Sequence, residues 1–341
     1  MKMVSKKISK VALGVALLGF AGANAQVTIS AADGWLESAY AEWASDGSDS
    51  YNVYYSGAGA SNVKVDAQLI RKYGSKFRVD AVGLKAGDYT LKVVSVKGGK
   101  EGASTTSKSL KVKAHDRSGF AFSNSHVPGA YKADGTLKSG AVVFYVTEST
   151  KNTITLDVVT SSKGATTACT GWQSILTAYK KGYDTRPLDF RLIGNVTDPA
   201  ETDKGDILVD MGKKEGMSMT IEGIGNDATA NGWGIRVKNA QDVEIRNLGI
   251  MNVDSDEGDN IGLQQDNKYV WVHNCVFDNL KKELREKPMT YKEFSEFLGI
   301  SEKSLQNKMS GATEFTYSEI KRTTKYIFPT VKVSYLFDLD D

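Results

Sequence analysis

Four carboxylates crowd one short segment of the chain. Asp254, Asp256, Glu257 and Asp259 all lie between residues 254 and 259. Like charges this close repel one another unless water or a hard cation screens them. Calcium takes about six to eight oxygen ligands in proteins, many of them from carboxylates. The segment therefore indicates either a calcium site or a solvated acidic turn.

The chain has two cysteines, Cys169 and Cys275. In an exported protein they could form the disulfide Cys169–Cys275, and two buried free thiols are the alternative. Neither cysteine lies in a spacing typical of a metal-ligand set or a catalytic nucleophile.

A repeated pattern surrounds the acidic segment and must position it. Alternating apolar residues recur at 219–221, 243–245 and 270–272, so the repeats begin 24 and then 27 residues apart. Short strands with a period in the twenties are typical of a solenoid, in which each coil stacks its inward residues on the next. A leucine-rich repeat has a similar period, but its leucine pattern is absent. A right-handed parallel β-helix fits best.

The first residues have the pattern of a secretory signal peptide. Four lysines between residues 2 and 10 precede an apolar stretch over residues 11–21, which is too short to span a bilayer. Ala23-Asn24-Ala25 offers a small-residue cleavage site. We expect residues 1–25 to be removed and the protein to be secreted, periplasmic or at the cell surface. No later segment is apolar enough to cross a membrane, and the net charge of +2 indicates neither a membrane nor a nucleic acid as partner.

Residues 26–115 are predicted to be a β-sandwich. The segments 38–44 and 51–55 alternate between apolar and polar residues, and a Leu-x-x-Gly-x-Tyr corner follows at 84–89. These strands and the corner resemble a fibronectin type III domain, in which the corner tyrosine bonds back to the chain upstream. Exposed aromatic residues here would bind carbohydrate, and the alternative is that they belong to the core and an ordinary surface.

The next segment, residues 116–279, contains the most distinctive sequence motifs of the chain. A predicted helix over 171–181 leads into a strand over 186–198, and the solenoid repeats follow. Residues 223–239, 246–252 and 258–275 resemble the pectate lyases of polysaccharide lyase family 1, of the Bacteroidetes type with an N-terminal fibronectin-like module. The resemblance implies calcium-dependent β-elimination of pectin or polygalacturonate.

The same resemblance assigns roles to the acidic segment. Asp259 matches a calcium ligand best, Glu257 takes the place of a second acidic ligand, and Asp256 and Asp254 are further candidates. The family's remaining ligands and its catalytic arginine belong to coils that would follow Phe277, where this chain changes to a helical pattern. We therefore expect an incomplete catalytic site, with no catalytic residue assigned. A non-catalytic carbohydrate-binding protein is one alternative.

Residues 280–341 resemble a phage-repressor-type helix-turn-helix domain. Thr290 and Glu293 are placed as a helix-capping pair, and Ser301 can cap a second helix. In that fold the second helix enters the major groove of DNA. The side chains that would face DNA are Lys303, Ser304, Gln306, Asn307 and Lys308. The alternatives are a DNA-binding regulator and a small helical bundle without a DNA role.

The predicted fold is mainly β: a β-sandwich, a truncated right-handed parallel β-helix and a small all-α helix-turn-helix domain. A signal peptide exports the chain, whereas a repressor domain has its target in the cytoplasm. We therefore interpret the chain as a chimera, arising from a natural fusion or from a sequence artefact.

Overall fold

The computed structural model describes residues 27–278 continuously. Beyond them it describes residues 280, 283–284, 287, 289–309, 313–331 and 333–337. The predicted signal peptide, residues 1–25, lies outside these described residues. Within them, no helix is both long enough and apolar enough to cross a membrane.

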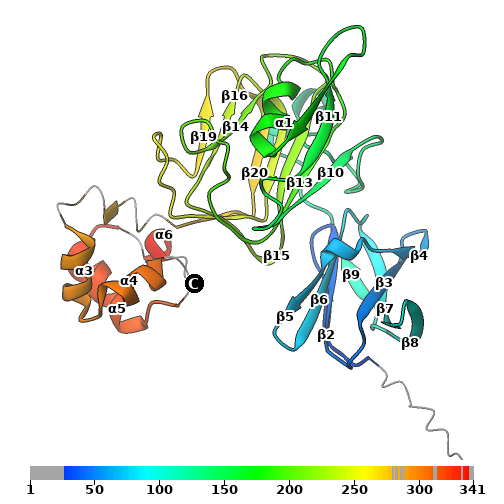
Figure 1. Ribbon diagram of the computed structural model, residues 1–341, viewed down its shortest axis with the longest axis horizontal. Helices are drawn as coiled ribbons and strands as arrows, with labels where there is room; N and C mark the ends of the chain where they lie inside the picture. Colours follow the sequence, from blue (N-terminus) through cyan, green and yellow to red (C-terminus); the bar gives the residue numbers. More distant parts are fainter. Residues whose placement is uncertain are drawn as a thin grey trace, which may run out of the picture.

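Two antiparallel sheets form the N-terminal sandwich, which ends with β9 (Figure 1). The first sheet has the order β1-β2-β6-β5, with β1 Ile29–Gly34, β2 Ser38–Ala44, β5 Ile70–Tyr73 and β6 Lys76–Val82. The second has the order β4-β3-β7-β8 with β9 beside β7, and comprises β3 Ser50–Gly57, β4 Ala60–Lys64, β7 Gly87–Lys97, β8 Lys100–Thr106 and β9 Leu110–Val112.

One apolar core joins the two sheets of the sandwich. Trp43 is fully buried, and its ring meets Tyr51 edge-on with the centroids 5.2 Å apart. At the predicted corner, the Tyr89 hydroxyl is hydrogen-bonded to the Lys85 backbone. A short 3₁₀ turn, η1 Ala67–Leu69, links the strands, and another, η2 Phe120–Ser125, follows the sandwich.

A parallel β-solenoid of about three turns follows, which agrees with the β-helix predicted from the repeats. Its main sheet has the order β10-β13-β15-β17-β20, with β10 Val142–Val146, β13 Leu188–Val196, β15 Met219–Asn231, β17 Gln241–Arg246 and β20 Lys268–His273. The strands β18 Gly249–Met251 and β21 Val276–Asp278 extend it. A second sheet has the order β14-β16-β19, with β14 Ile207–Asp210, β16 Ile235–Lys238 and β19 Ile261–Gln264.

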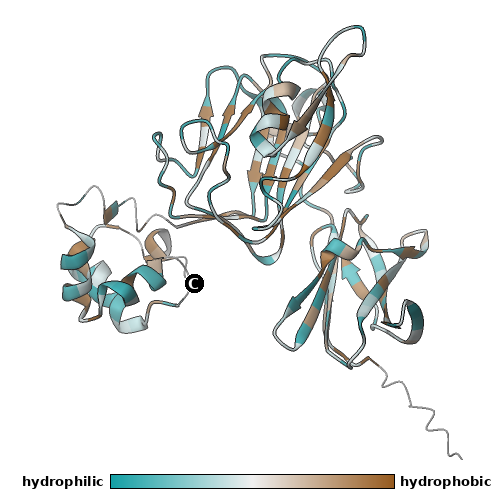
Figure 2. Cartoon of the chain, viewed as in Figure 1, coloured by the Kyte–Doolittle hydropathy of each residue, from teal (hydrophilic) through white to brown (hydrophobic). Residues whose placement is uncertain are grey.

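The solenoid forms because the repeats found in the sequence stack in register. Met219 pairs with Val243, and Val243 pairs with Val270, so the inward apolar residues of successive coils lie on one another. Figure 2 shows brown, apolar bands along the strands of the solenoid, interrupted by white and teal ones. At one end the helix α1 Trp172–Tyr179 packs with the hairpin of β11 Thr155–Val159 and β12 Thr166–Thr170. Trp172 stacks on Phe190 there, which caps the core.

The sandwich is fastened to the solenoid by long-range contacts. Arg71 of β5 donates hydrogen bonds to the Ile224 carbonyl at 2.8 Å and to Asp227 at 3.1 Å. The Tyr73 hydroxyl donates to the other oxygen of Asp227 at 2.9 Å. The two cysteines are free thiols, Cys169 buried and Cys275 partly buried, so the alternative without a disulfide is the one observed.

The C-terminal part is helical. It contains α3 Tyr291–Leu298, α4 Glu302–Met309, α5 Tyr317–Arg322, the π-helix η3 Thr323–Ile327 and α6 Val333–Phe337. The predicted capping box of Thr290 and Glu293 starts α3, and Gly299 in the left-handed region ends it. Phe294, Leu298 and Leu305 are buried in a separate core.

Candidate functional site

The acidic turn lies between β18 and β19, as the sequence predicted for a segment at a strand edge. Asp254, Asp256 and Asp259 are exposed. Glu257 accepts a hydrogen bond from Lys204 Nζ at 2.8 Å, and its nearest approach to Arg236 is 3.9 Å. The hydrogen bond and the charge of Lys204 lower the pKa of Glu257.

This turn does not by itself make up a calcium ligand set. In the described part of the chain, no three Asp, Glu, His or Cys side chains gather into a group that could hold a metal ion. Lys204 and Arg236 supply the positive charge that a cation would otherwise supply to Glu257. The role of Asp254, Asp256, Glu257 and Asp259 as calcium ligands stays a prediction.

Arg236 is the guanidinium beside the turn, and it is held by two carboxylates and a backbone carbonyl. It is buried, forms an ion pair with Asp203, and its Nε lies 3.2 Å from Asp206 Oδ2. The other oxygen of Asp206 accepts a hydrogen bond from the Gly234 amide at 2.9 Å. Because guanidinium groups stay protonated in proteins and this one is paired, Arg236 is not placed to accept a proton.

We expect calcium to bind the acidic turn only weakly, in the millimolar range. Few carboxylates point at any one place, so an ion would lack most of its preferred oxygen ligands. Titration calorimetry of the full chain with calcium chloride checks this. Lys204→Ala releases Glu257 and should tighten binding, whereas micromolar binding that disappears in Asp259→Ala would contradict the expectation.

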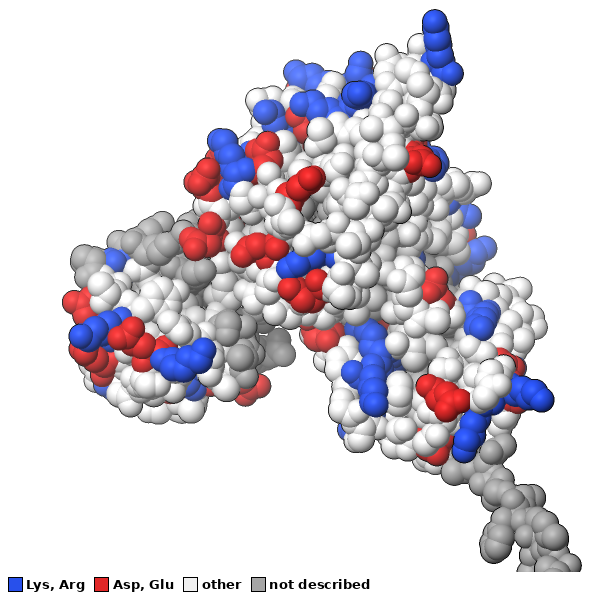
Figure 3. Space-filling view, in the orientation of Figure 1, with Lys and Arg blue, Asp and Glu red and all other residues white. Residues whose placement is uncertain are grey.

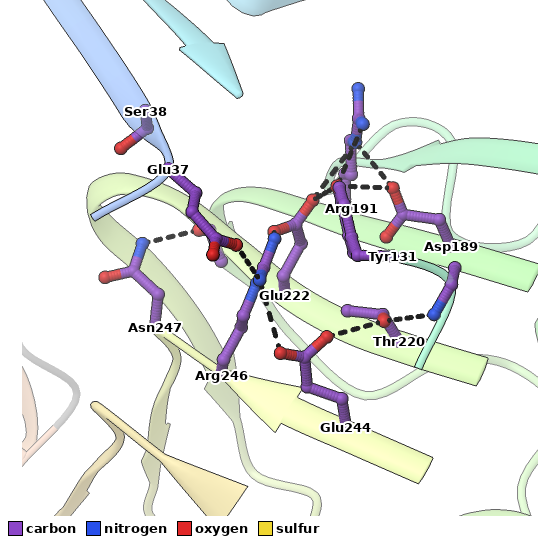
Figure 4. Close-up of polar contacts among 12 residues, drawn as sticks. Glu37, Ser38, Tyr131, Asp189, Arg191, Thr220, Glu222, Glu244, Arg246 and Asn247 are labelled. Atoms are coloured by element: carbon purple, nitrogen blue, oxygen red, sulfur yellow. Dashed lines mark hydrogen bonds and ion pairs between the residues drawn. The ribbon is translucent and has the colours of Figure 1, made fainter. Parts of the chain in front are cut away.

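A second polar cluster, which we call the charged ladder, lies on the outward face of the main sheet (Figure 4). It comprises Asp189, Arg191, Glu222, Glu244 and Arg246. The strand register places Arg191, Glu222 and Arg246 side by side on β13, β15 and β17. Their charges therefore alternate from coil to coil, and each charge lies next to its opposite.

The ladder's ion pairs are close and continuous. Glu222 lies 3.2 Å from Arg191 Nε on one side and 2.8 Å from Arg246 Nη2 on the other. Arg246 Nη1 lies 3.2 Å from Glu244 Oε1, and His273 Nε2 on the next coil lies 3.2 Å from the same oxygen. The ladder thus runs across the described coils of the solenoid.

Residues from outside the solenoid cover the ladder. The Tyr131 hydroxyl donates to Asp189 at 2.9 Å and also bonds to Glu222. Glu37, from the turn between β1 and β2, reaches Arg246 at 3.5 Å and is also paired with Arg117. Asp189 is 0% and Glu244 1% exposed, so the ladder is closed to a polymeric substrate. It fastens the sandwich to the solenoid.

Burial and ion pairing shift the pKa values of the ladder carboxylates in opposite directions. Burial alone would raise the pKa of Glu244, but the charge of Arg246 and the hydrogen bond from His273 outweigh it and lower that pKa to about 2. Burial and the neighbouring charge of Glu222 raise the pKa of Asp189. These shifts report a desolvated ion network rather than an exposed acid or base.

His115, which packs against the ladder, makes stability depend on pH. Burial, and then the charge of Arg246, lower its pKa to about 4; Glu37, His273 and Glu244 also face it. Since an unfolded histidine has a pKa near 6.5, the unfolded state binds more protons below that pH, and stability falls as the pH drops from about 6.5 to about 4. In His115→Gln, the drop in the urea midpoint between pH 7 and pH 4.5 should be smaller than in the wild type. An equal drop in the two proteins would contradict this assignment.

Sequence reasoning did not find the ladder, although a signal was present. The positions next to the inward residues of the repeat carry charges of both signs, at 222, 244 and 246. The apolar positions of the repeat predict the solenoid, and the charged positions beside them indicate the ladder. Glu37 and Tyr131 come from distant segments and gave no such signal.

The residues predicted to face DNA lie on α4. Lys303 and Gln306 are exposed, while the Ser304 backbone amide donates a hydrogen bond at 3.0 Å to the Oγ of Ser301, which caps the helix. Lys308 is directed inward: its Nζ donates to the Glu314 carbonyl at 2.6 Å and lies 3.0 Å from Glu319. On the visible face of the helical part, positive and negative side chains are mixed (Figure 3). DNA binding through Lys303, Ser304, Gln306, Asn307 and Lys308 stays a prediction.

The fold and site define a mainly β chain built on a parallel β-solenoid. No protein-family model matches it. Its sequence is similar over short stretches to pectate lyases. The probable pectate lyase A of Aspergillus flavus is 42% identical over 62 residues, 18% of this chain and 19% of that protein. Pectate lyase A of Aspergillus niger is 48% identical over 54 residues, 15% and 16% of the two chains.

A bacterial relative is matched over a longer stretch. The pectate trisaccharide-lyase of Bacillus licheniformis is 30% identical over 118 residues, 34% of this chain and 33% of that protein. The chain therefore spans only 16% to 33% of the length of these three curated relatives. A solved pectate lyase from a Bacillus sp., in complex with trigalacturonate, aligns with 48% of this chain and 43% of that chain, at 22% identity and a TM-score of 0.34.

Proposed function

We propose that the chain is an exported, pectate lyase-like protein that binds polygalacturonate and does not turn it over. The similarity of 30% to 48% to proteins named pectate lyases carries this proposal. The parallel solenoid is consistent with it. The ion pairs of Arg236 with Asp203 and Asp206, and of Glu257 with Lys204, favour binding without elimination.

The outward face of the β14-β16-β19 sheet is the part of the solenoid best suited to an acidic polymer. Lys238 projects from β16 beside Asp210 and Gln264 in the neighbouring strands, because the inward positions are taken by Ile235 and Val237. Lys204, whose side chain is 56% exposed, lies at the same side next to the acidic turn. Lys238, and the two N–H groups of Lys204 that Glu257 does not take, offer charge to the carboxylates of successive galacturonate units, and such contacts weaken with added salt.

Titration calorimetry with tetragalacturonate tests the proposal. Lys204→Ala/Lys238→Ala should weaken binding by up to about thirtyfold, since exposed charge pairs contribute up to about 1 kcal/mol each and about 1.4 kcal/mol corresponds to a factor of ten. Lys163→Ala, on the turn between β11 and β12, removes an exposed lysine elsewhere and should bind as the wild type does. No binding by the wild type, or equal binding by the double variant, would contradict this proposal.

A further inference from the structure

A pocket of about 420 Å³ lies between the sandwich and the solenoid, and no residue in it belongs to the acidic turn. We call it the interdomain pocket. Its walls come from the β1–β2 turn and β6 of the sandwich, and from the segments that follow the ladder positions of β15, β17 and β20. Its size is within the range of about 300–1,000 Å³ that small-ligand sites occupy, and such sites favour domain interfaces.

The two arginines of this pocket are already paired. Arg78 forms hydrogen bonds with Asp80 at 2.8 and 2.9 Å and with Glu42 at 2.8 Å. Arg246 is held by Glu222 and the rest of the ladder. Neither guanidinium is therefore available to the carboxylate of an acidic ligand, and the exposed Asp33 at the rim would repel one.

The uncharged groups of the pocket are available. The Trp35 side chain is 59% exposed, while the Trp35 backbone is fixed by hydrogen bonds to Ser38 and Lys113. Within the described residues, the Trp35 indole nitrogen, the Tyr40 hydroxyl and the Asn226 amide have no hydrogen-bond partner. An indole presents a large apolar face with a polar edge, and the other groups donate or accept hydrogen bonds.

We propose that the interdomain pocket binds a neutral sugar of a glycan chain. The apolar face of a pyranose ring would lie on Trp35, and its hydroxyls would meet Tyr40, Asn226 and Asp33. A ligand without charge fits because every arginine in the wall is neutralised. This site is separate from the lysine-bearing face of β14-β16-β19 and does not depend on the function proposed for that face.

Titration of the full chain with three neutral tetrasaccharides, built of glucose, mannose or galactose, tests the proposal, and tetragalacturonate serves as the acidic counterpart of the galactose form. At least one neutral tetrasaccharide should bind. Trp35→Ala should weaken that binding at least about tenfold, and Tyr183→Ala, which removes an exposed aromatic side chain outside the pocket, should leave it unchanged. Asp33→Asn should reduce the pocket's discrimination against tetragalacturonate.

Lys204→Ala/Lys238→Ala distinguishes the two sites, because it should retain neutral-sugar binding. The absence of binding by all three neutral tetrasaccharides would overturn the proposal. So would equal binding by wild type and Trp35→Ala, or displacement of the neutral sugar by equimolar tetragalacturonate.

Discussion

Replacing Arg246 with leucine should lower the free energy of unfolding by about 3–5 kcal/mol, the usual cost of removing one partner from a buried ion pair. Arg246 neutralises Glu222 and Glu244 within the ladder and also meets Glu37 from the sandwich. Without Arg246, these carboxylates remain buried away from water with too little positive charge beside them. The urea midpoint of the full chain, followed by circular dichroism, measures the loss.

Lys213→Ala is the matched control for this prediction. It breaks the ion pair of Lys213 with Asp266, whose side chains are both more than half exposed, and such pairs contribute about 1 kcal/mol or less. Adding Glu222→Gln to Arg246→Leu should recover part of the loss, because it removes one unpaired negative charge. If Arg246→Leu unfolds at the wild-type midpoint, the ladder does not hold the two parts together.

The sequence predicted the inward half of the solenoid well. The residues at 219, 243 and 270 pack in one row, because a stacked coil buries the same position in each turn. The helix predicted over 171–181 is α1, and the capping of α3 by Thr290 and Glu293 is confirmed. These features depend on local pattern and on residues a few positions apart.

The features that could not be predicted from the sequence depend on contacts between distant segments. Arg71 meets Asp227, and Glu37 meets Arg246, across intervals that no period connects. The same limit applies to the acidic turn. Its composition indicated a cation, but the cation beside Glu257 is Lys204, from a connection 53 positions away in the chain. Local composition gives the charge of a segment and not the partner that neutralises it.

Purified full-length chain should not cleave polygalacturonate above the calcium-containing blank. β-Elimination needs a base that takes the proton beside the uronate carboxylate, and a positioned general base is worth roughly 10²–10⁴ in rate. Arg236, the guanidinium beside the acidic turn, is paired with Asp203 and Asp206 and is not placed to take that proton. The carboxylates of the ladder are buried and cannot reach a polymer.

The measurement is the ultraviolet absorbance of the unsaturated product, followed in calcium and in a chelator, with an active pectate lyase as the positive control. Binding of tetragalacturonate by the same preparation shows that the chain is folded, so an absence of product then reports the chemistry alone. A steady rise in absorbance that both the chelator and Asp259→Ala abolish would contradict the prediction. It would place a base next to the acidic turn and make Asp259 a functional calcium ligand.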